Sequence, residues 1–183
     1  IGFIASKPFA KIDASTLSSW IRKSDGTSIL IRRLIMIADD LKLNGRLTVN
    51  LVAEDGSIKE TQEIPNLVVT TGKAYVASRM AGTSASVMSH MAIGTSSTAA
   101  AAANTTLANE VARVAISSAN VASNDIVYSA TFPASTPSSA AAVVEAAIFN
   151  ASSSGTMLCR TVFSVINKAS TDSISIQWTI TAS

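Results

Sequence analysis

The sequence predicts a mainly β protein: an antiparallel β-sandwich or jelly-roll-like barrel with one short helix and an extended N-terminal arm. Apolar and polar residues alternate in several short runs, as expected for β-strands with one buried face. Turn-forming residues separate these runs at regular spacing, which is typical of all-β domains. The first part of the chain lacks this pattern. We therefore expect an arm over residues 1–44 and a β-sandwich body over residues 45–183.

A β-hairpin is predicted at the start of the body. Leu47, Val49 and Leu51 alternate with polar residues, and Asp55-Gly56 follows them before a second, weaker alternating run. An Asp-Gly pair between two strands predicts a type I′ turn, because the central residues of that turn need positive φ angles.

A short helix is predicted next, over about residues 71–81. The run NLVVT reads as a short buried strand, and Thr71 is placed to cap the helix that follows it. Gly82 stands where a helix commonly ends in a left-handed residue.

Six further strands are predicted after the helix. In order they are VMSHMAIGT, EVARVAISSANV, DIVYSATFP, VVEAAIFN, TMLCRTVFSVI and SISIQWTIT. The connection SSTAAAAANTTLANE follows the first of them, and its alanine run is too short to form a stable helix by itself. The last run alternates most clearly, with Ile174, Ile176, Trp178 and Ile180 predicted to face inward.

The composition favours a protein that associates with other subunits. Hydrophobic residues make up 48% of the 183 residues and charged residues 14%, against about 25% charged residues in an average soluble domain. A weakly charged surface promotes association. A low-charge monomeric β-domain with alanine-rich loops fits the composition equally well.

Charge and hydropathy argue against nucleic-acid and membrane partners. The net charge of +2 is too small to indicate nucleic-acid binding. No apolar run reaches the about 18 residues of a membrane span. The N-terminus, IGFIASKPF, lacks the features of a signal peptide, so we expect the chain to fold in a reducing cytoplasm.

A search for reactive groups predicts no enzyme, no cofactor, no metal and no small-molecule substrate. His90 is the one histidine and lies in an alternating run, so a packed or interfacial role is favoured over that of a base. Cys159 lies in an apolar run and is expected to be a buried thiol. The segment TTGK resembles the end of a phosphate-binding loop, but Leu67 and Ala74 stand where the full motif needs a glycine and a hydroxyl residue.

The carboxylates Glu110, Asp125, Glu145 and Asp172 are scattered, without a pair that suggests acid–base catalysis. Glu145 is unusual because it interrupts the apolar run VVEAAIF. It fits either a buried, hydrogen-bonded carboxylate or the outward residue of an edge strand, and we favour the second.

The arm is basic. Six basic and two acidic residues give residues 1–35 a net charge of +4. Arg22, Lys23, Arg32 and Arg33 form a candidate interface for an acidic partner surface, although a solvated arm explains them equally well. Met36 offers an alternative translation start, which would remove the arm.

From about Leu41 to the C-terminus, the chain resembles a family of small structural proteins from tailed-phage virions. The segments that carry the resemblance are NLVVTTGKAYVASRM, VMSHMAIGTSSTAAAAANTTLANEVARV, YSATFPA, VVEAAIFNASSSGTMLCRTVF and INKASTDSISIQWTIT. The second segment is also similar, more loosely, to a pattern of tail-fibre and tail-collar proteins, M-A-(I/V)-G-T followed by T-x-L-x-x-E-x-x-R. Residues 1–35 fall outside the resemblance.

The resemblance implies a virion protein assembled in the cytoplasm of the bacterial host, with no catalytic residues to carry over. We expect a capsid decoration (cement) protein, a homotrimer that binds the major capsid protein across capsomers. A tail-fibre, neck or baseplate adaptor is the alternative. A small receptor- or glycan-binding module is a third reading, but the chain lacks the cluster of Trp and Tyr residues that sugar stacking needs.

Overall fold

The computed structural model describes residues 21–22, 28–29, 41–83 and 85–183. The chain divides into two units, residues 1–40 and 41–183. In the first unit, β1 (Ile21–Arg22) pairs in antiparallel register with β2 (Ser28–Ile29). The rest of the predicted arm lies outside the described residues, apart from the segment from Leu41 onward.

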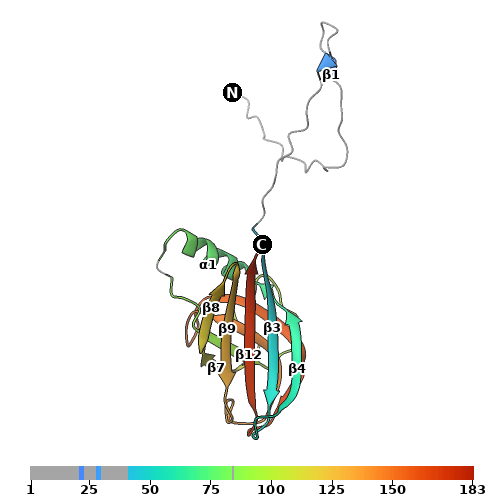
Figure 1. The fold of residues 1–183 in the computed structure, drawn as a ribbon, viewed down its shortest axis with the longest axis vertical. Helices are drawn as coiled ribbons and strands as arrows, with labels where there is room; N and C mark the ends of the chain where they lie inside the picture. The colour runs from blue at the N-terminus through green and yellow to red at the C-terminus, as the bar shows by residue number, and fades with distance from the viewer. Residues whose placement is uncertain (1–20, 23–27, 30–40, 84) are drawn as a thin grey trace, which may run out of the picture. The chain divides into compact units, whose positions relative to one another are not determined.

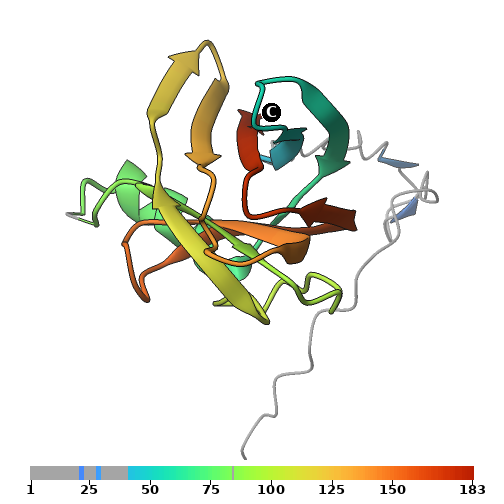
Figure 2. The same ribbon diagram turned by 90° about the horizontal axis from the view of Figure 1, so that it is seen from below.

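The second unit is an antiparallel β-sandwich, as the sequence predicts. One sheet has the order β4 (Ile58–Pro65), β3 (Leu43–Val52), β12 (Ser173–Ala182), β9 (Asp125–Phe132) and β8 (Ser118–Ala122). The other has the order β5 (Leu67–Val68), β11 (Met157–Lys168), β10 (Ala141–Phe149), β6 (His90–Gly94) and β7 (Glu110–Ala115). Figure 1 faces the first sheet, and Figure 2 shows the second sheet across the core from it.

The main core lies between the two sheets. The predicted inward face of β12 is confirmed, because Ile174, Ile176, Trp178 and Ile180 are all buried while Gln177 is exposed. β3 contributes its predicted alternating leucine and valine residues to the same core. Burial of this much apolar surface is the main stabilising term of a fold of this kind.

The middle of the second sheet is buried on both faces. Ala146 and Ile148 of β10 belong to the core between the sheets. Ala147 and Phe149 point to the other side of β10 and are also fully buried, packed with Leu107 in a second apolar cluster. The long loop 95–109, which joins β6 to β7, therefore covers the outer face of this sheet.

The predicted helix is present as α1 (Thr70–Met80), but its predicted cap is wrong. The N-cap residue is Val69, whose backbone is extended and whose side chain makes no capping hydrogen bond. The hydroxyl of Thr71 instead donates to the carbonyl oxygen of Met157 on β11, at 3.1 Å. Gly82 follows the helix at φ +72°, so the predicted glycine stop is confirmed.

The β3–β4 hairpin is present, with a different turn from the one predicted. Gly56 has φ +84°, whereas Asp55 has no positive φ. The Gly56 N–H donates to the carbonyl oxygen of Ala53 at 3.0 Å. This is the pattern of a three-residue loop in which a left-handed glycine follows a turn, rather than a type I′ turn.

The run EVARVAISSANV forms two strands rather than one. The Ile116 N–H donates to the carbonyl oxygen of Ser89, beside the second sheet, whereas the Ser117 N–H donates to that of Ser129 in the first. The chain therefore crosses from β7 in one sheet to β8 in the other between these two residues.

Candidate functional site

The most concentrated group of buried charge is an ion pair on the outer face of the second sheet. Glu145 on β10 and Arg160 on β11 have side chains that are 0% and 1% exposed. Arg160 pairs across the strands with Ala147, which places Glu145 diagonally opposite it on the same face. Arg160 Nε and Nη2 donate to Glu145 Oε2 at 3.0 and 2.8 Å.

Glu145 also holds both ends of loop 95–109. Its carboxylate accepts hydrogen bonds from the backbone N–H groups of Ser96 (3.3 Å), Ala108 (3.1 Å) and Asn109 (2.8 Å). A buried carboxylate needs such donors, because an unpartnered charge in the protein interior is strongly unfavourable.

Arg160 holds the middle of the same loop. Its Nη2 donates to the carbonyl oxygen of Thr98 at 2.7 Å, and its Nη1 donates to Ala99 O at 3.2 Å and to Asn104 Oδ1 at 2.9 Å. Together with the two bonds to Glu145, these bonds use all five N–H donors of the guanidinium group.

The pair is suited to fixing the loop rather than to reacting with a ligand. Its donors are used within the chain, and the surrounding backbone leaves little room. A Cβ atom on Gly94 would lie 2.5 Å from both Glu145 Oε1 and Asn109 O. Glycine at this position thus allows loop 95–109 to approach β10 closely.

The favoured interpretation of Glu145 as the outward residue of an edge strand is wrong. β10 lies between β11 and β6 in the sheet, and Glu145 is the buried, hydrogen-bonded carboxylate of the alternative reading. The sequence carried a usable signal that we missed. Arg160 also interrupts an apolar run, and two opposite charges that each interrupt an apolar strand are natural partners in a core.

A second arginine organises the neighbouring loop. Arg113 on β7 makes two hydrogen bonds with Glu110, of 2.9 and 2.6 Å, and its guanidinium carbon lies 3.8 Å from the centre of the Phe149 ring. Its Nη1 also donates to the carbonyl oxygens of Ala151 and Ser154 at 2.9 Å. Arg113 therefore fastens the β10–β11 connection to β7.

The predicted reactive candidates do not come together. The half-buried His90 contacts Ser89, with 2.8 Å between its Nδ1 and Ser89 Oγ. In the residues that the structure describes, no carboxylate hydrogen-bonds to this imidazole. Cys159 is buried as expected, and its burial raises the pKa of its thiol well above the ordinary value. Asp172, in the turn between β11 and β12, is bound by Lys59 of β4 at 2.7 Å, away from the Glu145 pair.

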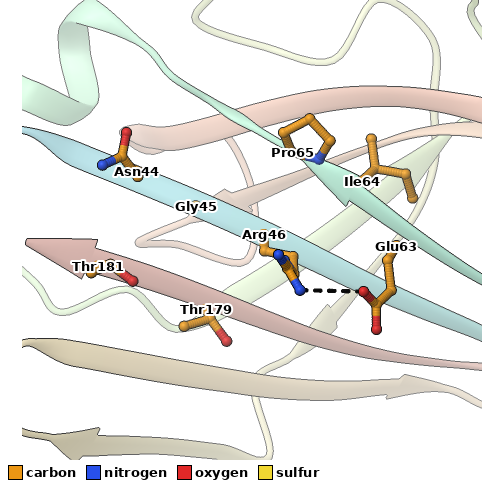
Figure 3. Close-up of a pocket in the computed structure, with 8 residues that line it drawn as sticks. All are labelled: Asn44, Gly45, Arg46, Glu63, Ile64, Pro65, Thr179 and Thr181. Atoms are coloured by element: carbon orange, nitrogen blue, oxygen red, sulfur yellow. Dashed lines mark hydrogen bonds and ion pairs between the residues drawn. The ribbon is translucent and has the colours of Figure 1, made fainter.

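An open groove of about 740 Å³ lies over β3, β4 and β12 (Figure 3). Its lining mixes polar side chains, such as Thr179, with apolar ones, Ile64 and Pro65. The two charged side chains of the lining, Arg46 and Glu63, form an ion pair with each other at 3.3 Å. The groove is thus an open surface of mixed polarity whose two charged side chains already pair with each other.

Of the predicted interface residues, Arg22 belongs to β1. Lys23, Arg32 and Arg33 lie outside the described residues.

Comparison with known proteins identifies no relative. No family model matches the chain, and no curated protein or solved structure gives a significant match. Within the described residues, no helix has the length and apolar character needed to cross a membrane. The same residues contain no group of three or more His, Cys, Asp or Glu side chains that could hold a metal ion.

Proposed function

We propose that the protein is a structural component of a tailed-phage virion, a capsid decoration protein that binds across capsomers and stabilises the head shell. It acts by binding rather than by catalysis and needs no cofactor. Its partners are further copies of itself, expected as a trimer, and the major capsid protein.

The observation that supports this proposal most is that segments carrying the phage resemblance contact one another at the Glu145–Arg160 pair. Glu145 comes from VVEAAIFN, Arg160 from MLCRTVF, and the loop that both hold is GTSSTAAAAANTTLAN. Two segments of the resemblance, one that contains both charged residues and one that forms the loop, thus make one interlocked unit. The resemblance therefore rests on the framework of the fold, which suits a structural module better than an enzyme.

The mechanism is the sum of many modest contacts. An interface of standard size removes roughly 1,600 Å² of surface from water. Repeated over many copies on one shell, contacts of modest affinity reinforce one another through multivalency. A body whose internal charges are already paired is suited to this role, since it keeps its shape while its outer surfaces bind.

The alternative is a tail-fibre, neck or baseplate adaptor. The pattern shared with tail-fibre and tail-collar proteins includes Leu107, Glu110 and Arg113. In this fold, Leu107 is buried in the second apolar cluster, and Glu110 and Arg113 form the ion pair that holds the β10–β11 connection. These residues thus serve the framework, so the pattern is compatible with a head or a tail location.

The test is to locate the protein in purified virions by cryo-electron microscopy, with mass spectrometry of the same particles. Density at capsomer junctions is the expected result, density in the tail favours the alternative, and absence from the particle contradicts both. In rebinding assays with particles that lack the protein, we expect removal of residues 1–35 to weaken binding at least about tenfold, or 1.4 kcal/mol.

One rebinding variant combines four substitutions in the arm: Arg22→Gln, Lys23→Gln, Arg32→Gln and Arg33→Gln. The matched control is Lys73→Gln, on the exposed surface of α1. The combined arm variant is expected to lose most of the binding that is lost on removal of residues 1–35. The Lys73→Gln control is expected to bind as well as the native chain. Undiminished binding of the truncated protein would show that the arm is not part of the interface.

A further inference from the structure

The two edges of the first sheet differ in how they are protected. The strand β4 at one edge carries Lys59, Glu60, Glu63 and Pro65. Charges and proline on an edge strand prevent pairing with other chains. The strand β8 at the other edge, with the sequence SANVA, has no charged residue and no proline. In the second sheet, β7 carries Glu110 and Arg113, and β5 has two residues.

The outer side of β8 offers backbone groups to a partner. β8 and β9 are joined through the two residues Ser123 and Asn124, and Ala122 pairs with Asp125. Residues that flank a two-residue turn face each other as a hydrogen-bonded pair, and this pattern alternates along the strand. Ala119 and Val121 therefore direct their N–H and C=O groups away from β9. Among the described residues, no strand pairs with that side.

The side chains of these two residues add an uncovered apolar surface. Ala119 lies opposite the buried Tyr128 and Val121 opposite Ile126, so both point to the core side of the sheet. Even so, Val121 is 74% exposed. It borders a groove of about 350 Å³ with a mainly apolar lining that includes Tyr75 and Val76 of α1. A valine on the core side of a sheet is normally covered by the opposite layer.

We propose that β8 is a self-association edge, which pairs in antiparallel register with β8 of a second copy of this chain. Two observations support it independently: the unprotected backbone edge, and the apolar groove that Val121 shares with α1. The inference does not depend on the proposed virion role. The proposed β8–β8 contact is two-fold and makes a dimer. It is therefore a different contact from the one that would make the expected trimer.

A second copy fits this edge because two antiparallel copies of β8 can pair with each other in register. With Asn120 on the two-fold axis, Ala119 of one copy pairs with Val121 of the other, and both supply outward backbone groups. No like charges meet, since the strand has none. The two Asn120 side chains meet on the outer face, where the amide of each can donate to the other.

The first test is disulfide cross-linking of full-length Asn120→Cys. Residues that face each other in a non-hydrogen-bonded antiparallel pair have Cα atoms about 4.5 Å apart, within disulfide range. Oxidation is expected to link most of this variant into dimers. Thr61→Cys, also exposed but on the protected strand β4, is the matched control and is expected to stay monomeric in denaturing electrophoresis. The native Cys159 is buried and does not compete.

The second test measures the equilibrium itself. Sedimentation equilibrium of the full chain is expected to show a monomer–dimer equilibrium. Val121→Lys should raise its dissociation constant at least about tenfold, because it places two charges at one edge. The control Ile58→Lys puts the same charge at an exposed apolar position on β4 and is expected to leave the equilibrium unchanged. Circular dichroism checks that each variant is folded.

The proposal is wrong if Asn120→Cys cross-links no more than Thr61→Cys, or if Val121→Lys leaves association unchanged. A chain that stays monomeric up to its solubility limit, or a trimer that Val121→Lys does not affect, also overturns it. These measurements use no virus particle, so their failure is distinct from failure of the virion assignment.

Discussion

Two Glu–Arg pairs in the body have similar geometry and opposite surroundings. Glu145 and Arg160 lie 2.8 Å apart with side chains that are 0% and 1% exposed. Glu63 and Arg46 lie 3.3 Å apart, with side chains that are 59% and 71% exposed. The first pair binds loop 95–109 through six further hydrogen bonds. The second belongs to an open groove and is surrounded by solvent.

The difference shows that surroundings, rather than residue types, decide what an ion pair does for the fold. Water can replace either partner of the exposed pair, so such pairs contribute about 0–1 kcal/mol. Water cannot replace Arg160, and its removal would leave the Glu145 charge buried without a counter-charge. Breaking a buried pair costs about 3–5 kcal/mol.

Replacement of the buried arginine is therefore expected to have the largest effect. Arg160→Met keeps most of the apolar stem but removes five hydrogen bonds, and we expect the free energy of unfolding to fall by about 3–5 kcal/mol. Urea denaturation of the full chain measures this. Hydrogen exchange of the Ala108 and Asn109 amides should speed up, because Glu145 accepts from both. A loss below about 1 kcal/mol would show that the pair does not hold the loop.

The Lys59–Asp172 pair lies between the two extremes, because the lysine side chain is 47% exposed and the aspartate 2%. The hydrogen bond from Lys59 is the main cause that lowers the pKa of Asp172 below its ordinary value of 3.8. The folded state therefore binds this proton less tightly than the unfolded state. The resulting stabilisation is present above pH 3.8 and is lost as the pH falls through the lowered pKa.

We expect Asp172→Asn to destabilise the protein at neutral pH by less than Arg160→Met does, and to flatten the loss of stability at acid pH. Urea denaturation at a series of pH values from neutral to below 3.8 measures both effects. Glu54→Gln, in the exposed β3–β4 turn, is the matched acid-to-amide control. An acid limb of the same slope in Asp172→Asn and the native chain would contradict the assignment.

The elements with one buried face could be predicted from the sequence. In β12 the alternation of Ile174, Ile176 and Trp178 with polar residues identifies the strand and its inward side, because one face meets the core and the other meets water. The helix and its glycine stop were predictable for a similar local reason. The predicted Thr71 cap failed because β11 supplies another acceptor for its hydroxyl, the Met157 carbonyl, which local sequence does not reveal.

The Glu145 cluster could not be placed in the same way, because a loop covers the outer face of its sheet. Alternation disappears in β10, where residues 145–149 are all buried, so the period of the pattern no longer tells which side is inward. The partners of Glu145 come from the segment around Ser96, from Ala108 and Asn109, and from β11. The β7–β8 break escaped prediction for a related reason, since the sequence remains strand-like while the chain changes sheets at Ile116 and Ser117.

The smallest effect on the free energy of unfolding is expected for the exposed Arg46–Glu63 pair. This prediction directly tests the comparison between the exposed and the buried pair. Arg46→Met removes the same charge as Arg160→Met, from a strand of the same body, yet we expect a loss of only about 0.2–1 kcal/mol. A double-mutant cycle with Glu63→Gln isolates the pair's own contribution, which should shrink further in high salt because both side chains are in solvent. If Arg46→Met instead cost as much as Arg160→Met, exposure would not be what separates the two pairs. The Arg46–Glu63 contact in the groove of Figure 3 would then stabilise the fold, rather than only pair two charges on an exposed surface.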